Sequence, residues 1–117
     1  MHQIVPTDIA LHQKSKVLEL IWPDNVVHKL PVEFLRVYSP SAEVRGHGPG
    51  QEVLQLDKQD VNIQAIEPVG HYAIKITYDD GHDSGLYDWA LLRELGDNYQ
   101  SHWNDYLARC EAAGHVR

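Results

Sequence analysis

Residues 71–95 constrain the fold most, because they combine two strand-like runs, a tight turn and the start of a helix. Over residues 72–78, aromatic or branched side chains alternate with small or polar ones, the period of two expected of a strand. The Asp-Asp-Gly sequence at 79–81 supplies a hairpin turn, since glycine and aspartate tolerate positive φ. The return segment covers 82–87, and Asp88 can cap the helix that follows. This stretch therefore predicts a β-hairpin leading into a helix.

The first third of the chain predicts an antiparallel meander followed by a short helix. Apolar runs at 9–13 and 17–22 indicate a hairpin, and a third strand is expected over 26–30 after a proline-containing turn. Pro31 occupies a position that the first helical turn accepts, and the residues after it have an amphipathic pattern. Pro40 should end this helix, because the residue before a proline avoids helical geometry.

The middle of the chain is dominated by a predicted loop over 39–51, which is rich in proline and glycine. Loops of that length inside compact domains are usually functional or mobile. A weak strand and turn are expected over 53–60. Alternation of apolar and polar residues then predicts a strand over 61–68, which pairs with the central hairpin.

Two helices are predicted at the C-terminus. Gly96 suits the left-handed residue that ends the first helix, and Asp97 with Gln100 has the spacing of a capping box for the second. Gly114 should end that second helix. Its apolar stripe is more typical of a core than of an interface. The residues of this stripe are Tyr99, Trp103, Tyr106, Cys110 and Ala113.

Taken together, these patterns predict an α+β fold with a mostly antiparallel β-sheet, built from a meander and a central hairpin. A short helix follows the third strand, and the two C-terminal helices complete the fold. A length of 117 residues predicts one domain over 1–117.

Charge and cysteine content narrow the classes of partner. A formal net charge of −7 opposes binding to nucleic acid or to an anionic membrane, because both require clustered Lys and Arg. Cys110 is the one cysteine, which excludes an internal disulfide framework and a cysteine-built metal site within one copy. No apolar run approaches the ~20 residues of a membrane span. We expect a cytoplasmic protein with no nucleic-acid or membrane partner.

His82 is the main candidate for chemistry among the eight histidines, because it follows the turn and lies beside Asp79, Asp80 and Asp83. No histidine belongs to the i, i+4 pair with glutamate that is typical of a helical zinc site. Three interpretations of His82 remain open. Its ring holds the hairpin against the 39–50 loop by packing or hydrogen bonds, binds a metal with the nearby carboxylates, or contacts a partner directly.

Arg45 and His47 flank the start of a glycine-rich segment at 46–50. This segment has a superficial likeness to a phosphate-binding loop, but no Gly-Lys-Ser/Thr follows and Pro49 has no amide N–H to donate. The alternative is a loop whose glycines meet a need for positive φ, with Arg45 and His47 as exposed polar residues.

Two motifs in this order resemble a known family: EFLRVYSPSAEV at 33–44 and DGHDSGLYDWAL at 80–91. They are similar to the N-terminal domain of γ-butyrobetaine hydroxylase and to the free-standing bacterial proteins of that domain family, DUF971. The resemblance covers about residues 9–96. A C-terminal helical extension over 97–114 lies outside it.

The resemblance implies a structural zinc position that this chain has lost. In the hydroxylase, three cysteines and one histidine hold the ion, and their positions here are Ser39, Ser41, Val44 and His82. Serine is a poor zinc ligand and valine is none, so the site should not close. The resemblance further implies that the 39–44 segment still packs beside His82, with hydrogen bonds in place of metal bonds.

Three functional hypotheses follow. The first is a non-enzymatic binding or adaptor domain without a cofactor, which binds a protein partner or forms a homodimer. Its ground is the resemblance to accessory domains, some of which are attached to ATPases of iron–sulfur delivery. The second is an iron or zinc protein that uses His82, nearby carboxylates and His47. The third is an enzyme, accessory to 2-oxoglutarate oxygenase chemistry, with a pocket between the 39–50 loop and the hairpin. There His82 would be the base, and Arg36 or Arg45 would hold an anion.

Overall fold

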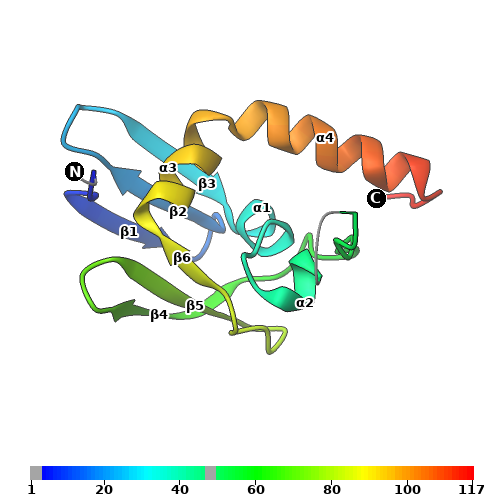
Figure 1. Ribbon diagram of the computed structural model, residues 1–117, viewed down its shortest axis with the longest axis horizontal. Coiled ribbons are helices and arrows are strands. Elements are labelled where there is room, and N and C mark those ends of the chain that lie inside the picture. The colour runs from blue at the N-terminus through cyan, green and yellow to red at the C-terminus, as the bar shows by residue number, and fades with distance from the viewer. Residues whose placement is uncertain (1–3, 47–49) are drawn as a thin grey trace.

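The computed structural model describes residues 4–46 and 50–117, which contain two three-stranded antiparallel sheets and four helices (Figure 1). The α+β fold, the short helix after the third strand and the two C-terminal helices are confirmed. The strands are β1 (Asp8–His12), β2 (Val17–Ile21), β3 (Val27–Pro31), β4 (Ile63–Val69), β5 (Ala73–Tyr78) and β6 (Leu86–Asp88). The helices are α1 (Val32–Val37), α2 (Ala42–Arg45), α3 (Trp89–Asp97) and α4 (Tyr99–Ala112).

Each sheet is a meander in which strands adjacent in sequence pair with one another. One sheet has the order β1-β2-β3 and the other β4-β5-β6. Two amide hydrogen bonds link the sheets, from Gln13 Nε2 to the carbonyl of Ile63 at 3.1 Å and from Asn62 Nδ2 to the carbonyl of Gln13 at 3.0 Å. The predicted turn at 79–81 is present, with Gly81 at a φ of 90°. The return strand predicted over 82–87 is wrong in its start, because β6 begins at Leu86 and residues 82–85 form a loop.

The predicted loop over 39–51 is wrong in one respect, because it contains the short helix α2. Ser41 caps this helix by accepting a hydrogen bond from the amide of Glu43 at 3.2 Å. The weak strand expected over 53–60 is also absent from the described residues. The amide of Val53 instead donates to the carbonyl of Val44 at 2.7 Å, which ties this segment to α2.

The predicted ends of the last two helices are partly correct. Asp88 caps α3 as expected, accepting from the amide of Leu91 at 2.7 Å, and Gly114 has a φ of 72° just beyond α4. Gly96 is not a left-handed terminal residue but lies inside α3. The predicted capping box is wrong, since α4 begins after Asn98 without a side-chain cap.

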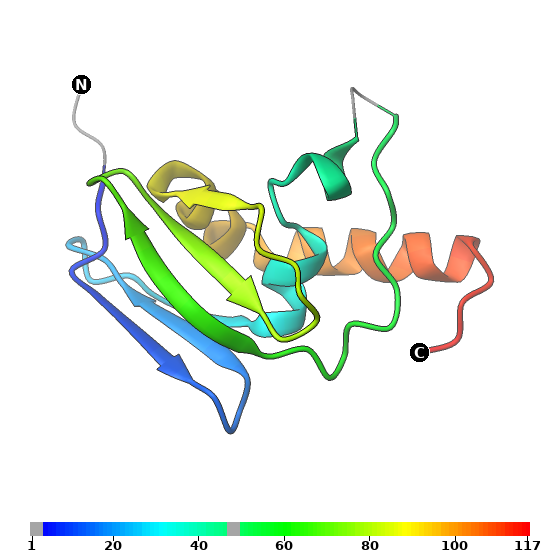
Figure 2. The same cartoon turned by 90° about the horizontal axis from the view of Figure 1, so that it is seen from below.

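The main hydrophobic core fills the space between the two sheets, α1 and α3, and a smaller cluster lies under α4. Figure 1 shows α4 at the top and β4–β5 at the bottom with α1 between them, and α2 to the right of β4–β5. Figure 2 shows α4 reaching away from the sheets along the long axis. Of the predicted aromatic stripe, Tyr106 and Cys110 are buried, and Trp103 packs partly buried against both clusters. No described helix is long and apolar enough to cross a membrane.

Candidate functional site

The ring of His82, in the loop between β5 and β6, is hydrogen bonded to two side chains from separate segments. His82 Nε2 is 2.8 Å from Ser39 Oγ, just after α1, and His82 Nδ1 is 3.0 Å from Glu43 Oε2 on α2. Ser39 is 1% exposed and His82 is 6% exposed. Both ring nitrogens therefore have protein partners, as the resemblance implied for the 39–44 segment.

Two further hydrogen bonds connect Ser41 to the same group of side chains. Ser41 Oγ is 2.6 Å from Ser84 Oγ, and the amide of Ser41 donates to Ser39 Oγ at 3.2 Å. Gly85 lies directly against Ser39, because a Cβ at this position would be 2.5 Å from Ser39 Oγ. We call Ser39, Ser41, Glu43, His82 and Ser84 the His82 cluster.

The aspartates next to His82 in sequence point to other partners. Asp80 accepts from Arg36 Nε at 3.0 Å, from Lys58 Nζ at 2.8 Å and from the amide of His82 at 3.1 Å. Burial alone would raise the pKa of Asp80, but these hydrogen bonds, led by that from Lys58, lower it to about 2. Asp79 accepts from the backbone amide of Asn62, the residue directly before β4. Asp83 is exposed, and its carboxylate lies 3.8 Å from Lys75 Nζ.

The donor set does not fit a metal centre. In the stretches 4–46 and 50–117, no three His, Cys, Asp or Glu side chains are placed to hold an ion. Val44 is buried and apolar, and the hydroxyls of Ser39 and Ser41 are bonded within the His82 cluster. His47, the other histidine suggested for a metal, lies outside the described residues.

A buried pair of tyrosines lies next to the cluster, with the ring centroids of Tyr78 and His82 6.0 Å apart. Tyr78 and Tyr87 share a hydrogen bond at 2.7 Å between their hydroxyl oxygens, and Tyr87 donates to the carbonyl of Leu35 at 2.7 Å. Burial raises the pKa of Tyr87 to about 12, and burial also raises the pKa of Tyr78 well above its ordinary value of 10. This pair ties β5 and β6 to α1.

A pocket of about 650 Å³ lies beside the His82 cluster. It is bounded by the end of α1, by α2, by residues 52–53 and by the helices α3 and α4, so we call it the α2–α4 pocket. It faces the C-terminal helices, whereas the pocket of the enzyme hypothesis was expected between the 39–50 loop and the hairpin. Its lining includes Val37, Tyr38, Ser39, Val44, Arg45, Gly46, Glu52, Val53, Leu91, Glu94, Leu95, His102 and Arg109.

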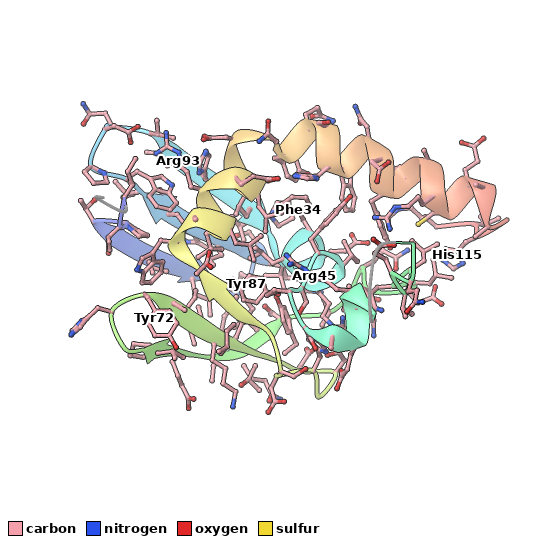
Figure 3. The ribbon with its side chains drawn as sticks, viewed as in Figure 1. Phe34, Arg45, Tyr72, Tyr87, Arg93 and His115 are labelled. Atoms are coloured by element: carbon pink, nitrogen blue, oxygen red, sulfur yellow. The ribbon has the colours of Figure 1, made fainter. Side chains whose placement is uncertain are left out.

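The two arginines proposed to hold an anion lie in different environments. Arg36 is 6% exposed, donates to Asp80 and Gln55, and is not part of the lining of the α2–α4 pocket. Arg45 lines the α2–α4 pocket, and Figure 3 shows it beside α1 and α2 in the middle of the view. Sequence reasoning missed Arg109, which reaches the same pocket from α4.

Hydrogen bonds fix one wall of the pocket. Tyr38 donates to the carbonyl of His102 at 2.7 Å and accepts from Arg109 Nη2 at 3.2 Å. Arg109 Nε is 3.2 Å from Asp105, close enough for an ion pair but too poorly aligned for a hydrogen bond. His102 Nε2 lies 2.8 Å from a carboxylate oxygen of Glu94, which joins α3 to α4.

Sequence reasoning also missed Glu43 and Ser84 as partners in the His82 cluster. The only signal for them was the family resemblance, which implied that the segment containing Glu43 packs beside His82. Each lies about 40 residues from its partner, with separations of 39 between Glu43 and His82 and 43 between Ser41 and Ser84. Neither hydrophobic periodicity nor motif spacing predicts contacts between residues so far apart in the sequence.

Solved structures of similar proteins share this architecture. One NMR solution structure has a TM-score of 0.85 and 47% sequence identity, and the match covers 99% of this chain and 91% of the other. A second NMR solution structure has a TM-score of 0.83 and 48% identity, and the match covers 98% of this chain and 86% of the other. A crystal structure of a protein of unknown function from Acidithiobacillus ferrooxidans, which belongs to the DUF971 family, has a TM-score of 0.66 and 33% identity. That match covers 78% of this chain and 91% of the other.

Family comparison agrees with these structural matches. None of the curated proteins compared matches this chain. The model of the gamma-butyrobetaine hydroxylase-like N-terminal family matches residues 9–93, which include the His82 cluster. The chain therefore belongs to the gamma-butyrobetaine hydroxylase-like N-terminal family, DUF971.

Proposed function

We propose that this chain is a non-enzymatic binding domain whose recognition site is the α2–α4 pocket. The observation that carries the proposal is the pocket itself, about 650 Å³ in volume and framed by a scaffold of hydrogen bonds. Binding sites are typically concave, with apolar walls and a few fixed polar groups, and this pocket has both. The His82 cluster holds α2 in place and so shapes one wall.

The His82 cluster supports the non-enzymatic part of the proposal. Ser39, His82 and Glu43 are hydrogen bonded in the order of a hydrolase triad. A nucleophile must reach its substrate, however. Ser39 belongs to the pocket lining, but it is only 1% exposed and Gly85 packs against its hydroxyl. Serine-directed fluorophosphonate probes should therefore leave Ser39 unlabelled in the folded protein.

A finer version of the proposal makes the domain an accessory to metal or iron–sulfur handling, as the resemblance implied. Cys110 is 2% exposed, so a cluster or ion would be held by the partner rather than by this chain. The partner in that version is a cytoplasmic protein that carries the metal. Copurification of iron or zinc with the captured partner, and not with the domain alone, is the result it predicts.

The proposal is tested by affinity capture from native lysate with two matched variants. Val53 lines the pocket and is 52% exposed, whereas Val27 is on β3, does not line the pocket and is 49% exposed. Val53→Asp should lose the partners that the wild type and Val27→Asp both retain, since a charge on the pocket wall opposes apolar contact. The absence of any reproducible partner, or equal loss in both variants, would contradict the proposal.

A further inference from the structure

We infer that the α2–α4 pocket takes a carboxylate group attached to an aliphatic body. This inference rests on the proposed function for the location of the site and adds the chemistry of the ligand. It is argued from the state of Arg45, from the position of Arg109 and from the side chains that form the pocket walls.

Arg45 differs from the other arginines in having no carboxylate partner. The chain has five arginines, and four form ion pairs with Asp or Glu at 2.6–3.2 Å. For Arg45 none is found within 4.0 Å among residues 4–46 and 50–117, and the sequence has no Asp or Glu at 1–3 or 47–49. In a chain of net charge −7, a guanidinium without a counter-ion beside a pocket is available for an anionic ligand.

Arg109 supplies a second guanidinium to the same pocket. Its side chain is 38% exposed, and its one hydrogen bond to a described residue runs from Nη2 to Tyr38. A guanidinium has five N–H donors in a planar fork that matches a carboxylate. Arg109 therefore keeps donors for a ligand, on the α4 side of the pocket, while Arg45 approaches from the α2 side.

The remaining lining selects the type of anion. The walls carry aliphatic side chains, which favour an aliphatic body on the ligand. Glu52 and Glu94 also line the pocket and oppose a group with two negative charges, such as phosphate, more strongly than a single carboxylate. The aliphatic residues are Val37, Val44, Val53, Leu91 and Leu95.

A carboxylate of this kind has two sources, a small aliphatic acid or the C-terminus of a protein that ends in an aliphatic residue. The test titrates ¹⁵N-labelled protein with hexanoate and with N-acetyl-alanyl-leucine. Hexanamide and the C-terminal amide of the peptide are the uncharged controls. Either carboxylate, or both, should shift the amide signals of Val44, Val53 and Leu91 saturably, and the one that binds more tightly identifies the source.

The variants assign the effect to Arg45. Arg45→Gln should weaken carboxylate binding about tenfold, the effect of one charge-assisted contact. Lys29→Gln is the control, because Lys29 is an exposed cation on β3 outside the pocket. Equal binding of the amides, no binding by either carboxylate, or unchanged binding in Arg45→Gln would overturn the inference. If carboxylates fail but Val53→Asp still abolishes capture, the proposed function stands and this inference alone is wrong.

Discussion

At the scale of single residues, Asp80 and His82 hold the β5–β6 loop to the helices from two directions. Asp80 binds Arg36 of α1 and Lys58, whereas the ring of His82 binds Ser39 and Glu43. The polar atoms of these two side chains are already hydrogen bonded to other parts of the protein, so they leave few donors or acceptors for a ligand. The cavity available to a ligand near this loop is the α2–α4 pocket.

Asp80 predicts how stability depends on pH. Its pKa is about 2 in the folded protein, below the ordinary 3.8, so it contributes stability that is present above pH ~3.8 and lost as the pH falls toward 2. Asp80→Asn should lower the free energy of unfolding by about 1 kcal/mol at pH 7, because solvent screens part of the interaction of this partly exposed carboxylate. The difference from the wild type should shrink as the pH falls through 2 and vanish below it. Urea unfolding over this pH range measures it.

The control for Asp80 is Asp83→Asn. Asp83 is exposed and lies 3.8 Å from Lys75, so its loss should change stability by less than ~0.5 kcal/mol at any pH. A loss at pH 7 that is equal for the two variants, or an Asp80→Asn effect that is undiminished at pH 2, would contradict the assignment.

Sequence reasoning found the central residue of the cluster but not its surroundings. His82 stood out because it follows the hairpin turn, yet the carboxylate at its ring is Glu43 and not Asp79, Asp80 or Asp83. Neighbours in sequence were the only partners that a local pattern could offer. The turn directs Asp80 to Arg36, and the fold brings α2 to the ring.

At the scale of elements, the hydrophobic periods predicted β1 to β5 and all helices except α2, while tertiary contacts set several of their ends. The return segment predicted over 82–87 is mostly loop, and the short strand β6 begins only at Leu86. Gly96 illustrates the difference. As a glycine near the end of a helical pattern it suggested a left-handed cap, but a Cβ at Gly96 would be 2.2 Å from His28 Nδ1. Close packing of α3 on β3, rather than a turn, requires the glycine. The four residues of α2 were too few to show a period.

Gly96→Ala should therefore destabilise the protein, although alanine normally favours a helix over glycine by about 1 kcal/mol. The ring of His28 cannot easily withdraw, because it accepts from Trp22 Nε1 at 2.9 Å and lies 3.0 Å from Asp97. We expect a loss of about 1–3 kcal/mol from this overpacking, measured by urea unfolding.

A double-mutant cycle separates the clash from other effects of the alanine. In a His28→Ala background the ring is absent, so Gly96→Ala should become neutral or stabilising. An equal loss in both backgrounds would show that the glycine is required for a different reason.

At the scale of the whole molecule, one main core joins both sheets to α1 and α3, and the smaller cluster under α4 contacts it through Tyr38 and Trp103. The antiparallel pairing was predictable from the alternating runs and turns. The division into two sheets was not, because alternation identifies the buried face of a strand without saying which strands share a sheet.

The shared packing predicts one cooperative unfolding transition for the predicted single domain. Trp22 and Trp89 belong to the main core, and Trp103 packs against both clusters. Urea transitions followed by tryptophan fluorescence and by far-ultraviolet circular dichroism should coincide. An earlier transition reported by a variant that retains Trp103 alone would show that α4 unfolds independently.

The central claim is a binding domain that does not depend on metal, with hydrogen bonds around His82 where the resemblance placed zinc. The most direct measurement is the metal content and thermal unfolding of wild type and His82→Ala, purified without chelator and then exposed to Zn(II) and Fe(II). The account predicts no stoichiometric metal in either protein, no effect of chelator on wild-type unfolding, and a variant destabilised by about 2 kcal/mol through its buried unpaired groups. Stoichiometric metal in the wild type that is lost in His82→Ala would contradict it.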